Sequence, residues 1–236
     1  KNIERVYMGD ANLYVNHSKG TCGTGTSSSP FNSFSALTSH FEDKGTILNK
    51  DVTVYVVSTG NVSDNLDIRG LSGRGTLTIR LDKGLILNSN SVAECAIYFY
   101  DCNTIITVDG GRSAYDSADG ALLNKWGCGV RFTKCKYGRV EKIAIDSTKN
   151  NKMGVMFDAT DGIADKIDTC NSYHGLWATR GSQVYQYDCC GSASTSYYSG
   201  EGALIQIGGE AYGIKINGSY RRVSGNILDF GNNPTG

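Results

Sequence analysis

The chain has 236 residues, enough for one substantial domain, and its 23 Lys and Arg residues balance its 23 Asp and Glu residues. This balance provides no strong field to attract nucleic acid or an acidic surface. No apolar run approaches the roughly 20 residues that cross a bilayer, so we expect neither membrane insertion nor a signal peptide. Thirty glycines against two prolines are typical of many short strands joined by tight turns.

Residues 1–45 predict a strand, a loop and one helix. Residues 12–16 alternate apolar and polar side chains, and residues 18–30 are rich in Ser, Gly and Thr. Apolar residues then follow the spacing of one helix face, at Phe34, Leu37 and Phe41. Asn32 or Ser33 is suited to cap this helix by accepting its unpaired N–H groups. We expect this unit to cover the end of a sheet stack.

Residues 46–236 predict strands that recur. Strong β runs lie at residues 52–57, 66–68 and 77–82, the last two separated by a glycine-rich turn from Gly70 to Gly75. The stretch Cys95–Cys102 is restated at Cys128–Cys135, and fainter copies begin at Gly154 and Gly175. Restatement of a small residue and two alternating apolar positions indicates one structural unit wound repeatedly. The sequence predicts an all-β, right-handed, single-stranded parallel β-helix with a short N-terminal helical cap.

Two further patterns accompany the repeat. An Asp or Asn follows a paired apolar signal at Asp82, Asp109, Asp146, Asp168, Asp188 and Asn217. We expect these side chains to bond local amides at equivalent turns and so to form one ladder. Cys95 and Cys128 are separated by the same number of residues as Cys102 and Cys135. Because no CxxC metal spacing occurs, we interpret these pairs as stacked small hydrophobic residues and not as bridges.

A row of outward side chains is the candidate binding site. When the copies are aligned, the residue directly after each small residue points into the coil. The residue after that one points outward, and these outward residues are Tyr98, Arg131, Met156 and Trp177. A second outward row holds Tyr100, Thr133, Asp158 and Thr179. Aromatic rings beside Arg and Asp suit a carbohydrate surface. The same residue types suit a subunit interface, so glycan binding, subunit contact and plain solvated surface remain open.

An enzyme of this fold would need paired carboxylates or a base near the outward rows. Asp158 is the carboxylate that the alignment places there, and it is the catalytic candidate if the protein is an enzyme. Glu201, Glu210 and Asp161 lie in predicted loops, and no spacing pairs them with it. Calcium at Asp146, Asp168 and Asp188 is a weaker interpretation than the backbone ladder. His17, His40 and His174 are scattered, so we expect no metal site and no cofactor.

Residues 12–41 resemble the opening of pectate-lyase-like β-helix domains in bacteriophage tail proteins. Tyr14-Val15-Asn16, the Gly-rich segment to Ser29-Pro30-Phe31, and the helix from Phe34 carry this resemblance. It departs from the family at Gly20-Thr21-Cys22-Gly23, where the family often has an Asp. The resemblance implies a tailspike or tail fibre on the virion that binds host cell-surface polysaccharide, usually as a homotrimer among other tail proteins.

Two alternatives to this function stay open. The first is a glycoside hydrolase or lyase of the same fold that degrades polysaccharide. The second is a structural fibre module without a ligand.

Overall fold

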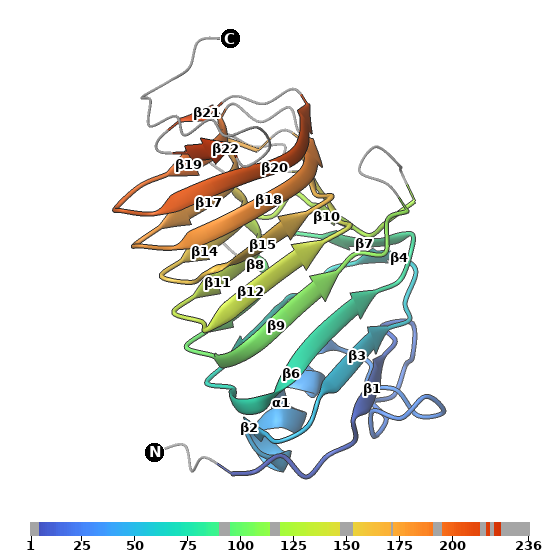
Figure 1. The fold of residues 1–236 in the computed structure, drawn as a ribbon. Helices are drawn as coiled ribbons and strands as arrows, with labels where there is room; N and C mark the ends of the chain where they lie inside the picture. The colour runs from blue at the N-terminus through green and yellow to red at the C-terminus, as the bar shows by residue number, and fades with distance from the viewer. Residues whose placement is uncertain are drawn as a thin grey trace.

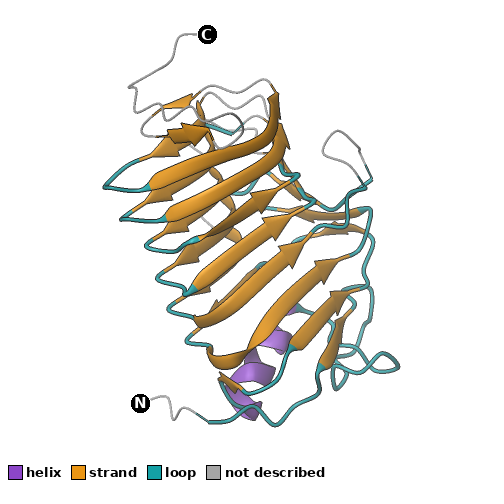
Figure 2. Ribbon diagram, viewed as in Figure 1, coloured by secondary structure: helices purple, strands orange, loops and turns teal. Residues whose placement is uncertain are grey.

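The computed structural model describes residues 5–89, 95–113, 119–146, 153–170, 172–190, 195–212, 216–217 and 220–222. Within these residues the chain is a parallel β-helix, in which each coil stacks on the one before (Figure 1). Strands dominate it, and one helix lies near the N-terminus (Figure 2). No helix in the described part of the chain is long and apolar enough to span a bilayer.

The strands form three faces, which we number in the order that a coil visits them. Face 1 contains β1 (Asn12–Val15), β3 (Val52–Val56), β6 (Ser72–Leu81), β9 (Asn103–Asp109), β12 (Tyr137–Glu141), β15 (Gly162–Asp165), β18 (Gln183–Cys190), β20 (Leu204–Tyr212) and β22 (Tyr220–Arg222). Face 2 contains β4 (Gly60–Val62), β7 (Leu85–Asn88), β10 (Leu122–Asn124), β13 (Ala144–Asp146) and β16 (Asp168–Cys170). Face 3 contains β5 (Leu66–Arg69), β8 (Cys95–Tyr100), β11 (Cys128–Thr133), β14 (Met153–Asp158), β17 (His174–Thr179), β19 (Thr195–Ser199) and β21 (Ile216–Asn217).

Two strands depart from this simple scheme. β2 (Ile47–Leu48) adds to the beginning of β6, which starts at Ser72 inside the predicted turn. β18 is long enough to pair with β15 on face 1 and to reach face 2, where Cys190 pairs with Asp168.

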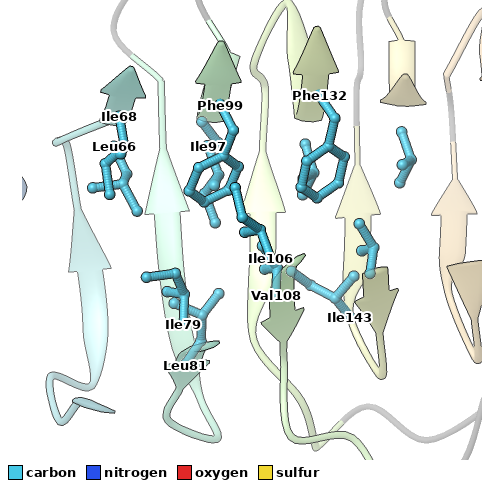
Figure 3. Packing of buried hydrophobic residues seen from close by; sticks show 14 of the residues in the cluster. Leu66, Ile68, Ile79, Leu81, Ile97, Phe99, Ile106, Val108, Phe132 and Ile143 are labelled. Carbon is cyan, nitrogen blue, oxygen red and sulfur yellow. The ribbon is translucent and has the colours of Figure 1, made fainter. Parts of the chain in front are cut away.

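The core is a set of apolar columns that run through the coils. The inward residues of face 3 are in register and buried, namely Ile97, Val130, Val155 and Leu176, then Phe99, Phe132, Phe157 and Ala178. The phenyl rings of Phe99, Phe132 and Phe157 stack with successive centroids 5.4 Å apart. Ile79, Ile106 and Val108 of face 1 close the core from the other side (Figure 3). Burial of each such side chain contributes about 1.5–3 kcal/mol.

The small residue at the start of each copy has a steric cause. A Cβ added to Gly154 would lie 2.4 Å from the carbonyl oxygen of Gly175 and 2.8 Å from Cγ2 of Thr169. Gly129 meets the same obstacle, because its added Cβ would lie 2.7 Å from both Gly154 O and Ile145 Cγ2. At these two positions the backbone of face 3 therefore passes too close to the next coil for a side chain.

The corner between face 3 and face 1 repeats one turn. Its left-handed backbone position is filled by Gly70, Asp101, Lys134, Ala159 and Arg180. The N–H of Asp101 donates to Thr133 O at 2.9 Å, and the N–H of Lys134 donates to Asp158 O at 2.9 Å. Hydrogen bonds of this kind join each turn to the next coil, so the corner keeps the coils in step.

The N-terminal helix α1 (Phe34–Lys44) confirms the predicted cap. Ser33 is the N-cap, and its hydroxyl accepts from Ala36 N at 3.2 Å. The predicted face of Phe34, Leu37 and Phe41 is buried, and α1 packs against β5, the first strand of face 3. Since β1 pairs with β3 and these residues belong to the same apolar cluster as the coils, residues 5–44 share one core with the solenoid.

The prediction of one Asp and Asn ladder is wrong. Asp109 lies on face 1 opposite Glu141, Asp146 lies on face 2 opposite Asn124, and Asp168 pairs with Ala144. The side chains of Asp188 and Asn217 lie outside the described residues. The pattern misled because apolar pairs followed by Asp occur on different faces of the coil. An amide ladder does exist on face 2, where Asn124 Nδ2 donates to Asn88 Oδ1 and Asn88 Nδ2 donates to Asn61 Oδ1, both at 2.7 Å.

Candidate functional site

The outer surface of face 3 carries the two predicted rows in register. Tyr98 pairs with Arg131, Arg131 with Met156, and Met156 with Trp177. The row is longer than predicted, and we define row 1 as Asp67, Tyr98, Arg131, Met156, Trp177 and Tyr198. Row 2 comprises Arg69, Tyr100, Thr133, Asp158 and Thr179. Neighbouring members of a row stand about 4.8 Å apart, the spacing of paired strands.

At the N-terminal end of these rows, arginine side chains lie beside tyrosine rings. The guanidinium carbons of Arg131 and Arg69 lie 5.3 and 5.6 Å from the ring centroid of Tyr98. Arg69 also lies 5.8 Å from the ring of Tyr100 and forms two hydrogen bonds with Asp67, at 2.9 and 2.8 Å. Because cations lie over the ring of Tyr98, it is held in place and is not a bare stacking platform.

Asp158 is a clamped carboxylate. It is 1% exposed, and both of its oxygens accept hydrogen bonds from Arg180. Arg131 Nη2 reaches Oδ2 at 3.2 Å, and Thr133 Oγ1 lies 3.4 Å from the same atom. Burial alone raises the pKa of a carboxyl group, but the hydrogen bonds and charges of Arg180 and Arg131 outweigh burial and hold the pKa of Asp158 below its ordinary value. The side chain therefore ties three coils together.

This geometry is poorly suited to the catalytic role proposed for Asp158. A general acid needs a raised pKa, and a nucleophile needs an oxygen that substrate can reach. Of the loop acids, Glu201 accepts from Thr179 Oγ1 at 3.0 Å, and Asp161 accepts from Gln183 N at 2.8 Å. The side chain of Glu210 lies outside the described residues. Any activity stays a prediction that only an assay tests.

Met156 occupies its predicted place in row 1 but is covered. It is 6% exposed and lies between Arg131 and Trp177 on the neighbouring strands. Its thioether therefore fills space beneath the polar groups. Any direct contact with a ligand falls to its neighbours.

Aromatic rings gather at the C-terminal end of row 1. The ring of His174 lies 5.1 Å from Trp177 and 4.7 Å from Tyr198, and Tyr173 lies 4.5 Å from His174. Trp177 Nε1 and His174 Nδ1 are buried atoms without a hydrogen-bond partner in the structure. Burial lowers the pKa of His174, so its ring is neutral at pH 7. These two atoms are exceptions to the rule that buried polar groups are hydrogen-bonded.

Sequence reasoning missed Asp67, Arg69, Arg180 and Tyr198. Asp67 and Tyr198 escaped because the copies at residues 66–69 and 195–199 lack the small residue used for the alignment. Arg180 escaped because it projects from the corner turn and not from a strand. The alternation of inward and outward residues, continued into the strand before the first copy and the strand after the last, would have identified Asp67 and Tyr198.

A second polar cluster closes the N-terminal end. His17 lies between two partners, with Nδ1 3.2 Å from Ser58 Oγ and Nε2 3.1 Å from Asp64 Oδ2. Asp64 Oδ2 also accepts from Phe34 N at 2.6 Å, at the start of α1. Although Ser, His and Asp make up hydrolytic triads, Ser58 is 3% exposed and its hydroxyl accepts from His17 N. The cluster fastens the loop, the helix and the first coil to one another.

The described residues hold no group of three or more His, Cys, Asp or Glu side chains that is arranged to bind a metal ion. The fold defines the protein as a parallel β-helix solenoid. Comparisons with family models, curated proteins and solved structures gave no match.

Proposed function

We propose that the outer surface of face 3 binds cell-surface polysaccharide, and that the protein is a host-recognition module of a phage tail or a similar surface fibre. The observation that carries this proposal is the register of rows 1 and 2. It brings Tyr, Trp, Arg and Asp side chains from six coils onto one surface. The resemblance of residues 12–41 to phage tail domains supports the biological setting.

The chemistry of the rows suits a hydroxyl-rich chain. Arginine donates several directed hydrogen bonds, tyrosine hydroxyls donate and accept, and ring edges contact the apolar faces of sugars. The cation–ring contacts hold Tyr98 and Arg131 in one arrangement before a ligand arrives. Because the rows run along the stack, a polymer lying on them contacts several coils, and its weak contacts add.

Tryptophan fluorescence gives a direct test. Sequence positions 126 and 177 are the two tryptophans, and Trp126 is buried with its Nε1 donating to Leu87 O at 2.8 Å. Titration with fractionated cell-surface polysaccharides should therefore change the emission of Trp177 and leave that of Trp126. We expect Trp177→Ala, read by calorimetry, to weaken binding at least tenfold.

Two tyrosine variants, one on each face, control for non-specific binding of the polysaccharide to exposed rings. Tyr98→Ala removes a ring from row 1 and should weaken binding about tenfold, whereas Tyr185→Ala removes an exposed ring from face 1 and should change it less than twofold. Equal losses for both variants, or no binding to any fraction, would contradict the proposal. The second result would favour a structural fibre module.

The enzyme alternative has its own readout. Incubation with the bound polysaccharide would release reducing ends if the protein is a hydrolase, or unsaturated uronates if it is a lyase. Product formation that Asp158→Asn abolishes, while binding persists, would support catalysis. Binding without either product excludes the enzyme for that polymer.

The homotrimer remains part of the proposal. Sedimentation equilibrium gives the number of subunits in the protein and in Tyr98→Ala. A trimer that Tyr98→Ala dissociates would show that face 3 is a subunit interface, as the sequence left open. A trimer that persists in this variant leaves face 3 available for the ligand.

A further inference from the structure

Four cysteines form two equivalent pairs that join β8 to β11. Cys95 and Cys128 are directly opposite each other in the ladder at the beginning of these strands. Cys102 and Cys135 follow the same strands, each one residue beyond a left-handed turn position. Their thiols lie in equivalent places, because Cys102 donates to Ile68 O at 3.8 Å and Cys135 donates to Phe99 O at 3.5 Å, each in the coil before.

The ladder places the first pair within reach of a covalent bond. Directly opposed residues of paired strands have Cα atoms about 4.8 Å apart, inside the range of about 4.4–6.8 Å that disulfides span. The two thiols of each pair are near enough for each to shift the pKa of the other. The bond that would form therefore needs a rotation of two side chains, and the strands keep their places.

The two pairs differ in how easily an external disulfide can reach them. Cys95 is half-buried, whereas Cys128, Cys102 and Cys135 are buried. The hydrogen bond from Cys128 lowers the pKa of Cys95, which favours its thiolate, and the nearby charge of Arg131 acts in the same direction. The same kind of hydrogen bond lowers the pKa of Cys135, but this sulfur is enclosed in the core.

We propose that Cys95 and Cys128 are the site of a reversible disulfide between neighbouring coils, and that Cys102 and Cys135 stay reduced beside it. The oxidant is a low-molecular-weight disulfide such as glutathione disulfide. The thiolate of Cys95 attacks one sulfur of this molecule, forms a mixed disulfide and releases one glutathione thiolate. Cys128 then loses its proton and attacks the sulfur of Cys95, so that the inter-coil bond forms and the second glutathione leaves.

Peptide mapping by mass spectrometry tests this proposal on the full chain. After incubation with glutathione disulfide, we expect a cross-linked Cys95–Cys128 peptide that lacks two hydrogen atoms, and unlinked peptides for Cys102 and Cys135. Cys128→Ser should trap glutathione on Cys95, because the resolving thiol is gone. Cys95→Ser should abolish the cross-link, and Cys102→Ser is the matched control that should leave it unchanged.

Thermal unfolding provides a second measurement. The cross-link closes a long loop, so oxidation should raise the Tm by about 5 °C or more, and reduction by dithiothreitol should reverse the rise. Glutathione that accumulates on Cys95 of the unchanged protein without forming a cross-link would overturn the proposal. So would equal oxidation of both pairs, or no oxidation while the exposed Cys22 reacts.

Discussion

Face 1 and face 3 have the same parallel geometry but present different outer surfaces. On face 3 the outward side chains interlock, and Met156 and Asp158 are buried although they point away from the core. On face 1 several outward side chains stay open to water, and Ile105 and Tyr187 are each 41% exposed. Strand register therefore fixes which side chains are neighbours, and the chemistry of those neighbours decides whether the surface closes over itself.

The charges of the two faces follow the same contrast. On face 3 two arginines from neighbouring coils converge on one carboxylate, Asp158. On face 1 three carboxylates stand directly beside one another, at Asp109, Glu141 and Asp165. Arg139 lies 2.5 Å from Glu141 and 3.6 Å from Asp165, and partly offsets their repulsion. Face 3 thus gathers two arginines around one buried carboxylate, whereas on face 1 the adjacent Glu141 and Asp165 share Arg139, Lys142 and Lys166.

The largest difference should come from removing one carboxylate on each face. Asp158→Asn removes the negative charge and one of the two oxygens that Arg131 and Arg180 share, and should cost about 2–4 kcal/mol of unfolding free energy. Glu141→Gln weakens its contacts with Arg139 and Lys142 but relieves repulsion from its neighbours, so its effect should stay within about 1 kcal/mol. Urea denaturation of both variants measures the two losses of unfolding free energy. Similar losses would show that the two faces are electrostatically alike.

A smaller difference should follow from truncating one apolar side chain on each face. Met156→Ala removes a covered thioether and should cost about 2 kcal/mol, because it leaves a gap under row 1. Ile105→Ala removes a side chain already in contact with water and should cost about 0.5 kcal/mol. Thermal unfolding with the same probe compares them. If Ile105→Ala is the more costly of the two, the contrast in burial is wrong.

The smallest effect should be a pH dependence to which His174 of face 3 contributes. Burial lowers the pKa of His174, so the unfolded chain binds a proton before the folded protein does. Stability should therefore fall as pH drops below about 6.5, the ordinary pKa of histidine, until His174 is also protonated in the folded protein. His174→Phe keeps a ring but should flatten this slope, with a residual part from His40, whose pKa burial also lowers.

Asp158 does not contribute to that slope. Its pKa is held below its ordinary value, so its contribution to stability is kept until the pH falls below about 4. An unchanged slope in His174→Phe would contradict the assignment to His174.

The parts of the fold that sequence could predict are those with in-phase repetition. The copies that begin at Cys95 and Cys128 align without an insertion. The alternation of apolar and polar residues therefore predicted correctly that Tyr98 and Arg131 are neighbours on paired strands. The start of the helix could also be predicted, because the capping residue Ser33 and the first apolar residue, Phe34, are neighbours in the sequence.

Sequence could not reveal contacts that depend on how three faces close. Asp109 and Asp146 follow similar apolar pairs, yet Asp109 ends β9 on face 1 and Asp146 ends β13 on face 2. The clamp on Asp158 depends on Arg180, which reaches it from a turn one coil further along. Exposure was equally unpredictable, since pointing outward did not make Met156 accessible.

The repeated corner turn has a practical consequence for the design of variants. Every connection from face 3 to face 1 between β5 and β20 has two to four residues, whereas the connection from β9 to β10 spans residues 110–121. A long connection is therefore already accommodated between β9 and β10, whereas every connection at the corner is short. A foreign peptide or an affinity label belongs in the β9–β10 connection, and the same insert placed at the corner would push adjacent coils out of step.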